Sequence, residues 1–329
     1  MTMFHLIKPG TSIDFVGKRN LWMGISVACI LLTILLFFTK GLNYGIDFTG
    51  GAEVQIKVPT SWDIGKVRSE METGNLKGVK VQQIGVPQDS TFLIKVQGDE
   101  KSLNQASTTV TEILTKSLKA TDFEIQRVDV VGPAAGSSLR TSGFLSMLYA
   151  MVGILIYVTI RFDYRYSPGA VAALFHDSVI TLGVFIITQK QFDLQILAAL
   201  LALIGYSNND TIIVYDRVRE TVHGHPELSI DQAVNRAVNE TLGRTILTSL
   251  CTFITVASLW FFGGKVIEDF AFTLMIGIAV GTYSSIYIAS SIVVAITHHN
   301  ENRNARMKAS GQSAKKKRQF VAPPEPKLS

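Results

Sequence analysis

Two aspartates stand inside long apolar stretches of this 329-residue sequence, and they are the first candidates for chemistry. Asp177 follows His176, and Asp210 follows a polar segment that begins at Gly205. If these stretches span a bilayer, each acid costs about 2.5–3.5 kcal/mol to insert and normally faces a bundle interior, on a proton or ion path. We therefore expect both acids to carry protons, or else to link neighbouring helices by hydrogen bonds alone.

Asp210 is the stronger candidate because the residues around it are polar on every side of the expected helix. The supporting residues are Tyr206, Ser207, Asn209 and Thr211. Polar groups at membrane depth are tolerated only against protein or a water-filled cavity. A proton carrier needs such access to water, so we expect Asp210 to load and unload protons.

Arg244, at the start of the fifth apolar stretch, is the expected partner of Asp210. Thr248, Thr252 and Thr255 follow it at steps of four, four and three, in one polar stripe expected to face the bundle. Burial favours the neutral form of an acid and a nearby cation favours the charged form, so an acid under both influences can titrate near neutrality. The alternative is that Arg244 is an ordinary cytoplasmic anchor whose side chain extends to the membrane interface.

The apolar stretches are long enough to cross a membrane. Only 17% of the residues are charged, against about 25% in soluble domains, and mean hydropathy is +0.28. A bilayer core needs about 20 helical residues. Suitable stretches lie at 21–39, 140–160, 167–188, 194–215, 244–264 and 270–297. The sequence therefore predicts a polytopic α-helical membrane protein with six transmembrane helices.

Lysines and arginines in the short connections predict the orientation of these helices, because such residues stay on the cytoplasmic side more often than they cross. The residues concerned are Lys8, Lys18, Arg19, Arg161, Arg165, Arg217, Arg219 and Arg236. Both termini, residues 1–20 and 298–329, are therefore expected in the cytoplasm, as is the loop at 216–243.

Two cytoplasmic segments are expected to lie near lipid. The segment from Asp231 to Leu242 carries alanines and valines on one side, which predicts an amphipathic helix at the membrane surface. Much of the excess positive charge, +5 overall, comes from the tail between Lys308 and Arg318, which suits anionic lipid. Nucleic acid is the weaker alternative, so we predict no nucleic-acid partner.

Residues 40–139 predict a folded domain on the far, exported side of the membrane. Alternation from Val54 to Val58 indicates a strand, and a helix follows a cap at Thr60–Asp63. A hairpin with its turn at 87–90, a second helix and a last strand complete the order βαββαβ, which predicts a ferredoxin-like periplasmic domain. It shows no catalytic constellation, so we expect a binding or force-bearing module.

Metal, redox and cofactor chemistry have little support in the sequence. Cys29 and Cys251 both lie in apolar stretches, without the spacing of a disulfide framework or a zinc site. Two histidine pairs lack acidic or cysteine companions. We predict no enzymatic activity, no metal and no cofactor, with protons as the coupling ion.

Four separated motifs stand out along the chain. They are Gly45-Ile46-Asp47-Phe48-Thr49-Gly50-Gly51; Arg161-Phe162 with Gly169-Ala170 and His176-Asp177; Ile204-Gly205-Tyr206-Ser207 with Asn209-Asp210-Thr211-Ile212; and Asp216-Arg217-Val218-Arg219-Glu220. In this order and with six spans, residues 21–297 resemble the SecF family, the smaller membrane subunits of the bacterial SecDF protein-export complex. Asn208 replaces the aliphatic residue expected before Asn209.

The resemblance implies a membrane half of the resistance-nodulation-division (RND) type, located in the bacterial inner membrane. It implies pairing with SecD, contacts with the SecYEG channel and YajC, and proton-driven assistance to unfolded polypeptides that leave the channel. It assigns the family's proton-pathway aspartate and arginine to Asp210 and Arg244, and a His-Asp pair to His176 and Asp177. Protonation of Asp210 is then expected to weaken its attraction to Arg244, shift the fourth and fifth helices and move the exported domain.

Three other functions remain open at this point. A proton-coupled RND-type exporter of small molecules shares the acid and the layout, although such pumps usually carry larger exported domains. An intramembrane aspartyl protease would use paired carboxylates, but Asn208-Asn209 stands where that family has Gly-x-Gly. A scaffold would steady its partners and move no protons.

Overall fold

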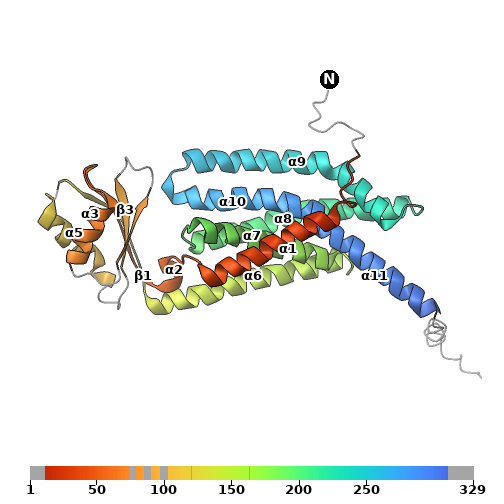
Figure 1. The fold of residues 1–329 in the computed structure, drawn as a ribbon, viewed down its shortest axis with the longest axis horizontal. Coiled ribbons are helices and arrows are strands. Elements are labelled where there is room, and N and C mark those ends of the chain that lie inside the picture. The colour runs from red at the N-terminus through yellow and green to blue at the C-terminus, as the bar shows by residue number, and fades with distance from the viewer. Residues whose placement is uncertain are drawn as a thin grey trace, which may run out of the picture.

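The computed structural model describes residues 12–74, 79–84, 90–96, 103–119, 121–162 and 164–309. Residues 87–89 of the expected turn and residues 310–329 of the basic tail lie outside them. An elongated helical bundle and a small sheet domain lie end to end (Figure 1).

Within the described residues, the bundle contains six helices long and apolar enough to span a membrane. They are α1 (Arg19–Thr39), α6 (Pro133–Arg161), α7 (Ser167–Thr188), α8 (Leu194–Gly224), α9 (Ile230–Phe262) and a continuous helix made of α10 (Lys265–Ser284), the π-helical η2 (Ser285–Ala289) and α11 (Ser290–Ala309). The predicted six-helix membrane fold is confirmed. The last helix and the acid-bearing α7 and α8 are far more buried than α1, α6 and α9, so both acids lie on central helices.

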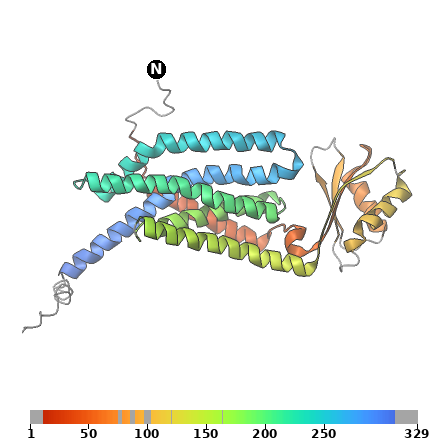
Figure 2. The same cartoon turned by 180° about the vertical axis from the view of Figure 1, so that it is seen from behind.

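The domain between α1 and α6 is a four-stranded antiparallel sheet in the order β2-β3-β1-β4, which confirms the ferredoxin-like fold. Its elements are β1 (Gly51–Lys57), α3 (Ile64–Thr73), β2 (Lys80–Ile84), β3 (Thr91–Val96), α5 (Ala106–Ser117) and β4 (Glu124–Val131). Helices α3 and α5 cover one sheet face, and the other face turns toward the bundle (Figures 1 and 2). Asp63 caps α3 by accepting a hydrogen bond from the Lys66 backbone N–H, three residues after the expected Thr60.

A glycine pair joins this domain to the bundle, directly after the short helix α2 (Ile46–Thr49). Gly50 has φ +71° and Gly51 has φ +149°, values that favour glycine. A Cβ on Gly50 would lie 2.6 Å from Pro133 Cα, at the start of α6. Both the backbone conformation and the close approach therefore require glycine at position 50.

We expect Gly50→Ala to destabilise this junction by about 2–4 kcal/mol, because a left-handed conformation and a steric overlap add together. Thermal unfolding of the purified protein, followed by circular dichroism, measures the effect. The matched control is Gly132→Ala, since a Cβ on Gly132 meets no atom within 4 Å. Equal unfolding temperatures for the two variants would contradict the expected overlap.

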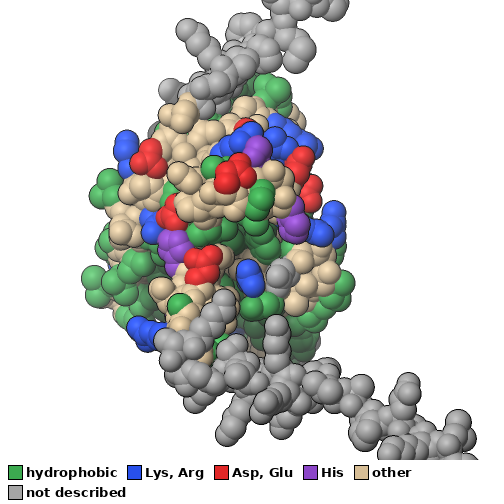
Figure 3. Space-filling model, turned by 90° about the vertical axis from the view of Figure 1, so that its right-hand side faces the viewer, with side chains coloured by type: hydrophobic (Ala, Val, Ile, Leu, Met, Phe, Trp, Pro, Cys, Tyr) green, Lys and Arg blue, Asp and Glu red, His purple; other side chains and the backbone are tan. Residues whose placement is uncertain are grey.

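At the other end of the bundle, the surface helix expected from Asp231 to Leu242 is wrong. A capping box between Ser229 and Gln232 starts α9, which continues unbroken to Phe262. Val234 and its apolar neighbours on α9 pack in a protein core, because the end of α8 extends beyond the apolar zone and covers them. Charged residues gather at this end (Figure 3), including the ion pairs of Asp231 with Arg19 and of Arg217 with Glu240.

Candidate functional site

Asp210 lies inside the bundle, where it is only 2% exposed. Ser249 Oγ of α9 donates a hydrogen bond to Asp210 Oδ2 at 3.1 Å, and Thr282 Oγ1 of α10 donates to Ser249 Oγ at 2.8 Å. One chain of hydrogen bonds thus joins three helices at this carboxylate. A change of its charge would act directly on the packing of α8, α9 and α10.

Several polar atoms of residues near Asp210 and Ser249 in the sequence have no hydrogen-bond partner within the described residues. Asn208 Oδ1, Tyr206 Oη and Thr245 Oγ1 are buried without a hydrogen bond. Thr245 lies one turn of α9 before Ser249, the residue bonded to Asp210. A buried polar atom without a partner costs about 1–3 kcal/mol, so this region favours water or polar groups from another subunit.

The prediction that Arg244 and the threonine stripe face the interior of this chain is wrong. Arg244, Thr248 and Thr255 are exposed, and the Arg244 guanidinium has no ion pair or hydrogen bond among the described residues. The interior face of α9 carries Thr245 and Ser249 instead, because one residue turns a helix by 100°. Arg244 lies five residues from Ser249, about 7.5 Å along the axis.

Helix α8 also exposes polar positions at membrane depth. Gly205 and Asn209 are exposed, while Ser207, Asp210 and Thr211 are buried. The described residues of this chain therefore leave one side of this segment uncovered. Exposed Asn209 and Arg244 would be costly against lipid.

Asp177 is the centre of a second buried cluster and is 1% exposed. Its Oδ2 accepts hydrogen bonds from Ser207 Oγ at 2.6 Å and Ser284 Oγ at 2.8 Å, and Oδ1 lies 3.0 Å from His176 Nδ1. Nearby, Thr211 Oγ1 lies 3.0 Å from Ser285 Oγ of η2. These contacts link α7, α8 and the last helix, so they favour an interhelical role for Asp177, and its proton-path role stays a prediction.

The glycine-rich motif holds the first residue of α8. Asp47 Oδ2 accepts a hydrogen bond from the Leu194 backbone N–H at 3.0 Å, and the Gly45 N–H donates to the Phe192 carbonyl at 2.7 Å. The Phe48 and Phe192 rings stack with centroids 5.5 Å apart. The motif continues directly into β1, so α8 is joined to the sheet at its first residue and carries Asp210 near its middle.

Ser249, Thr282 and Ser284 were not predicted from the sequence. Each hydroxyl contacts an acid, or a residue bonded to an acid, from a neighbouring helix. The signal for Ser249 was its spacing of four from Thr245, which competes with the spacing of the Arg244 stripe. The polar run that starts at Thr282 in an apolar helix was a comparable signal.

Metal binding has no geometric support in the part of the chain that the structure describes. No group of three or more His, Cys, Asp or Glu side chains is placed there to hold an ion. Cys29 and Cys251 are free thiols exposed on α1 and α9. The absence of a cofactor stays a prediction.

Comparison with known proteins gives matches over most of the chain. The profile "Protein export membrane protein SecD/SecF, C-terminal" matches residues 110–299, and "SecD/SecF GG Motif" matches residues 35–58. The protein translocase subunit SecF of Calditerrivibrio nitroreducens is 47% identical over 296 residues, 89% of this chain and 96% of the relative. SecF of Pseudomonas aeruginosa is 37% identical, over 90% and 95% of the two chains.

A solved structure has the same fold. The crystal structure of SecDF from Thermus thermophilus, a translocon-associated membrane protein, matches with a TM-score of 0.80 and 33% identity. The match covers 88% of this chain and 39% of the SecDF chain, so the chain spans about two-fifths of that protein. These matches confirm the predicted family and support a non-enzymatic role in transport. With its six spans, its ferredoxin-like domain and its glycine motif, the chain belongs to the SecF family of protein translocase subunits.

Proposed function

We propose that the chain, together with a SecD subunit, uses the proton gradient to assist protein export across the bacterial inner membrane. The observation that carries this proposal is the placement of α8. This helix holds the buried Asp210, and Asp47 of the motif that leads into β1 binds its first residue. A movement of α8 caused by protonation of Asp210 can therefore be transmitted to the exported domain through this one helix.

SecD is the partner that best explains the exposed polar positions of the membrane bundle. Asn209 and Arg244 need polar contacts that the described residues of this chain do not supply. The matched SecDF protein has further chain beyond the part similar to this one. We infer that SecD packs against α8 and α9, with both termini of this chain cytoplasmic. SecYEG, YajC and unfolded polypeptide complete the proposed assembly.

The proposed cycle begins with Asp210 ionised, bonded to Ser249 and attracted by Arg244. Protonation removes the charge, so α8 and α9 can shift relative to each other and move the Leu194 end against Asp47. One charge crossing the membrane supplies about 2.3 kcal/mol per 100 mV. A matched SecDF structure is described as a super-membrane-facing form and has a lower TM-score of 0.67, which fits a fold with more than one arrangement.

Collapse of the gradient tests this function. In inner-membrane vesicles with and without this subunit, export of a radiolabelled secretory protein is followed with ATP in excess. We expect the subunit to accelerate the late phase of export, and a protonophore to remove that acceleration. A subunit effect that persists at full size in the protonophore would favour the scaffold function.

A further inference from the structure

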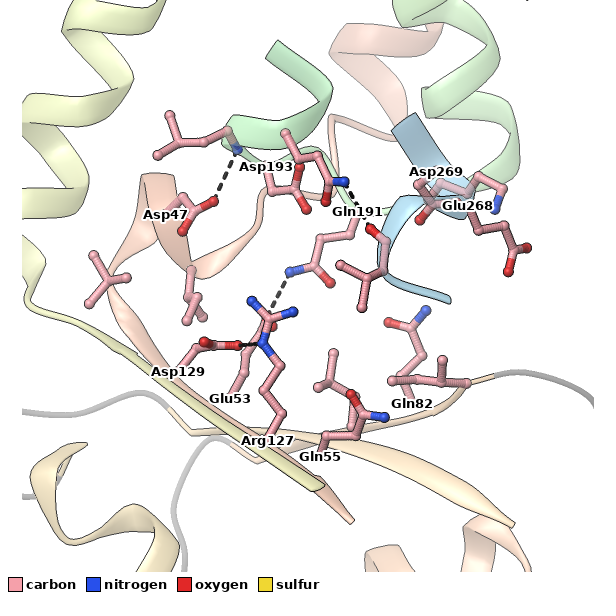
Figure 4. A pocket seen from close by; sticks show the side chains of 18 of the residues that line it. Asp47, Glu53, Gln55, Gln82, Arg127, Asp129, Gln191, Asp193, Glu268 and Asp269 are labelled. Carbon is pink, nitrogen blue, oxygen red and sulfur yellow. Dashed lines mark hydrogen bonds and ion pairs between the residues drawn. The ribbon is translucent and has the colours of Figure 1, made fainter. Parts of the chain in front are cut away.

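A cavity of about 620 Å³ lies between the exported sheet and the bundle (Figure 4). Its volume falls in the range of about 300–1,000 Å³ that is usual for ligand sites. The bundle-facing side of the sheet forms one wall, with Gln55 of β1, Gln82 of β2 and Arg127 of β4. The opposite wall is the α7–α8 connection, residues 190–193, with the start of α10. Figure 4 shows labelled side chains of both walls pointing toward each other.

The lining is strongly acidic. Six carboxylates line it, from Asp47, Glu53, Asp129, Asp193, Glu268 and Asp269, against two cations, Arg127 and Lys190. Each cation already pairs with a carboxylate: Arg127 with Asp129 at 2.6 Å, and Lys190 with Asp269. Glu53 pairs with Lys95 of β3 at 3.1 Å, so Asp47 and Asp193 carry the unpaired negative charge. Asp47 and Asp193 accept backbone N–H groups and form no ion pair among the described residues.

The Asp193 carboxyl is partly buried in the cavity near other negative charges. Burial raises the pKa of the Asp193 carboxyl above its ordinary value, and the charges of Asp47 and Asp269 act in the same direction, against the hydrogen bond from the Ile196 backbone. A cationic group brought into the cavity would relieve this repulsion. Attraction between charges in a partly enclosed site is stronger than in bulk water.

Amide side chains provide the second property of the lining. Gln55, Gln82, Gln83, Gln191 and Gln195 all line the cavity. An amide both donates and accepts hydrogen bonds, so it matches the N–H and C=O groups of an extended peptide without regard to side-chain identity. The side-chain amide of Gln82 has no hydrogen-bond partner among the described residues, and β2 is an edge strand that pairs with β3 alone.

We propose that this cavity binds short extended polypeptide segments that carry lysine or arginine. The amides would contact the backbone and the carboxylates would attract the basic side chains. The inference rests on the proposed function, because it names the substrate class and places it against the start of α8. A bound segment would then contact both the sheet and the helix that carries Asp210.

Photo-crosslinking to synthetic peptides tests the proposal on the full chain with SecD in lipid nanodiscs. A benzophenone amino acid replaces Gln82 in the cavity or, as the control position, Glu112, which lies on α5 behind the sheet and outside the cavity lining. The probes are ten-residue peptides of alternating serine and lysine, serine and glutamate, or serine and glycine. We expect the lysine peptide to crosslink at position 82 about fivefold more than the other two peptides, and more than at position 112.

The double variant Asp47→Asn/Asp193→Asn sharpens the test, because asparagine keeps an oxygen acceptor for each backbone N–H but removes both charges. It should reduce lysine-peptide crosslinking at position 82 about fivefold, while Asp122→Asn, exposed outside the cavity, should leave it unchanged. Equal crosslinking of all three peptides, or no change in the double variant, would overturn the proposal. If either result is obtained and gradient-dependent export of the unaltered complex is intact, the cavity proposal fails and the proposed function stands.

Discussion

Asp210→Asn is expected to abolish the gradient-dependent part of export while the subunit still accumulates and assembles. Asparagine has nearly the same shape and can still accept the hydrogen bond from Ser249, but it cannot titrate. About 100 mV acting on one charge biases a conformational equilibrium about fiftyfold, and the variant loses that bias. The measurement is the late phase of export in membrane vesicles, with and without a protonophore.

The matched control is Asp216→Asn, the same change on the same helix. The Asp216 side chain is 63% exposed and only 3.9 Å from Arg161, at the edge of ion-pair distance. A surface pair of this kind contributes about 0–1 kcal/mol, so this variant should export normally. Coupling through Asp210 is wrong if the Asp210→Asn variant responds to the gradient as the unaltered protein does.

Arg244→Ala is expected to remove most of the same gradient-dependent activity. The guanidinium is exposed in this chain and forms no ion pair among the described residues, so its loss should not reduce accumulation of the subunit. It should instead remove the cation that, in the proposed cycle, attracts Asp210 and contacts SecD. Arg244→Lys keeps the positive charge but not the planar guanidinium group with its paired N–H donors. It should therefore recover part of the activity lost in Arg244→Ala, in the same vesicle assay.

Arg236→Ala is the control for this position, because Arg236 lies two turns earlier on α9 and pairs with Glu240 at the surface. Little change is expected there. An anchoring role for Arg244 predicts a different result: the alanine variant would lose membrane accumulation, and the lysine variant would restore accumulation and activity together.

Much of the fold follows from local patterns in the sequence. Six uncharged apolar stretches are enough to predict six spans, because every backbone polar group in lipid must be satisfied within a helix. Alternation from Val54 to Val58 predicted the first strand of the sheet domain, whose core contains Val54, Ile56 and Val58. The glycines at 50 and 51 were part of a motif, but only the structure shows that φ and the contact with Pro133 require them.

The candidate site was harder to predict, for reasons of geometry. The cost of burying an acid identified Asp210 and Asp177 without any neighbour being known. Their partners depend on which helices pack together: Ser207 and Ser284 bind Asp177, while Ser249 binds Asp210. Helical spacing on α9 fitted two faces equally well, and hydrophobicity did not distinguish them, so the exposed face with Arg244 was predicted in place of the buried face with Ser249.

The most direct test of the central claim is proton entry into vesicles that contain only the purified complex of this subunit and SecD. A pH-sensitive dye inside the vesicles reports proton uptake after a gradient is imposed. We predict uptake that depends on the complex and disappears with Asp210→Asn, while Asp216→Asn behaves as the unaltered protein. Equal uptake by the unaltered complex and the Asp210→Asn complex, or no uptake by either, would contradict the role of Asp210 as a proton carrier.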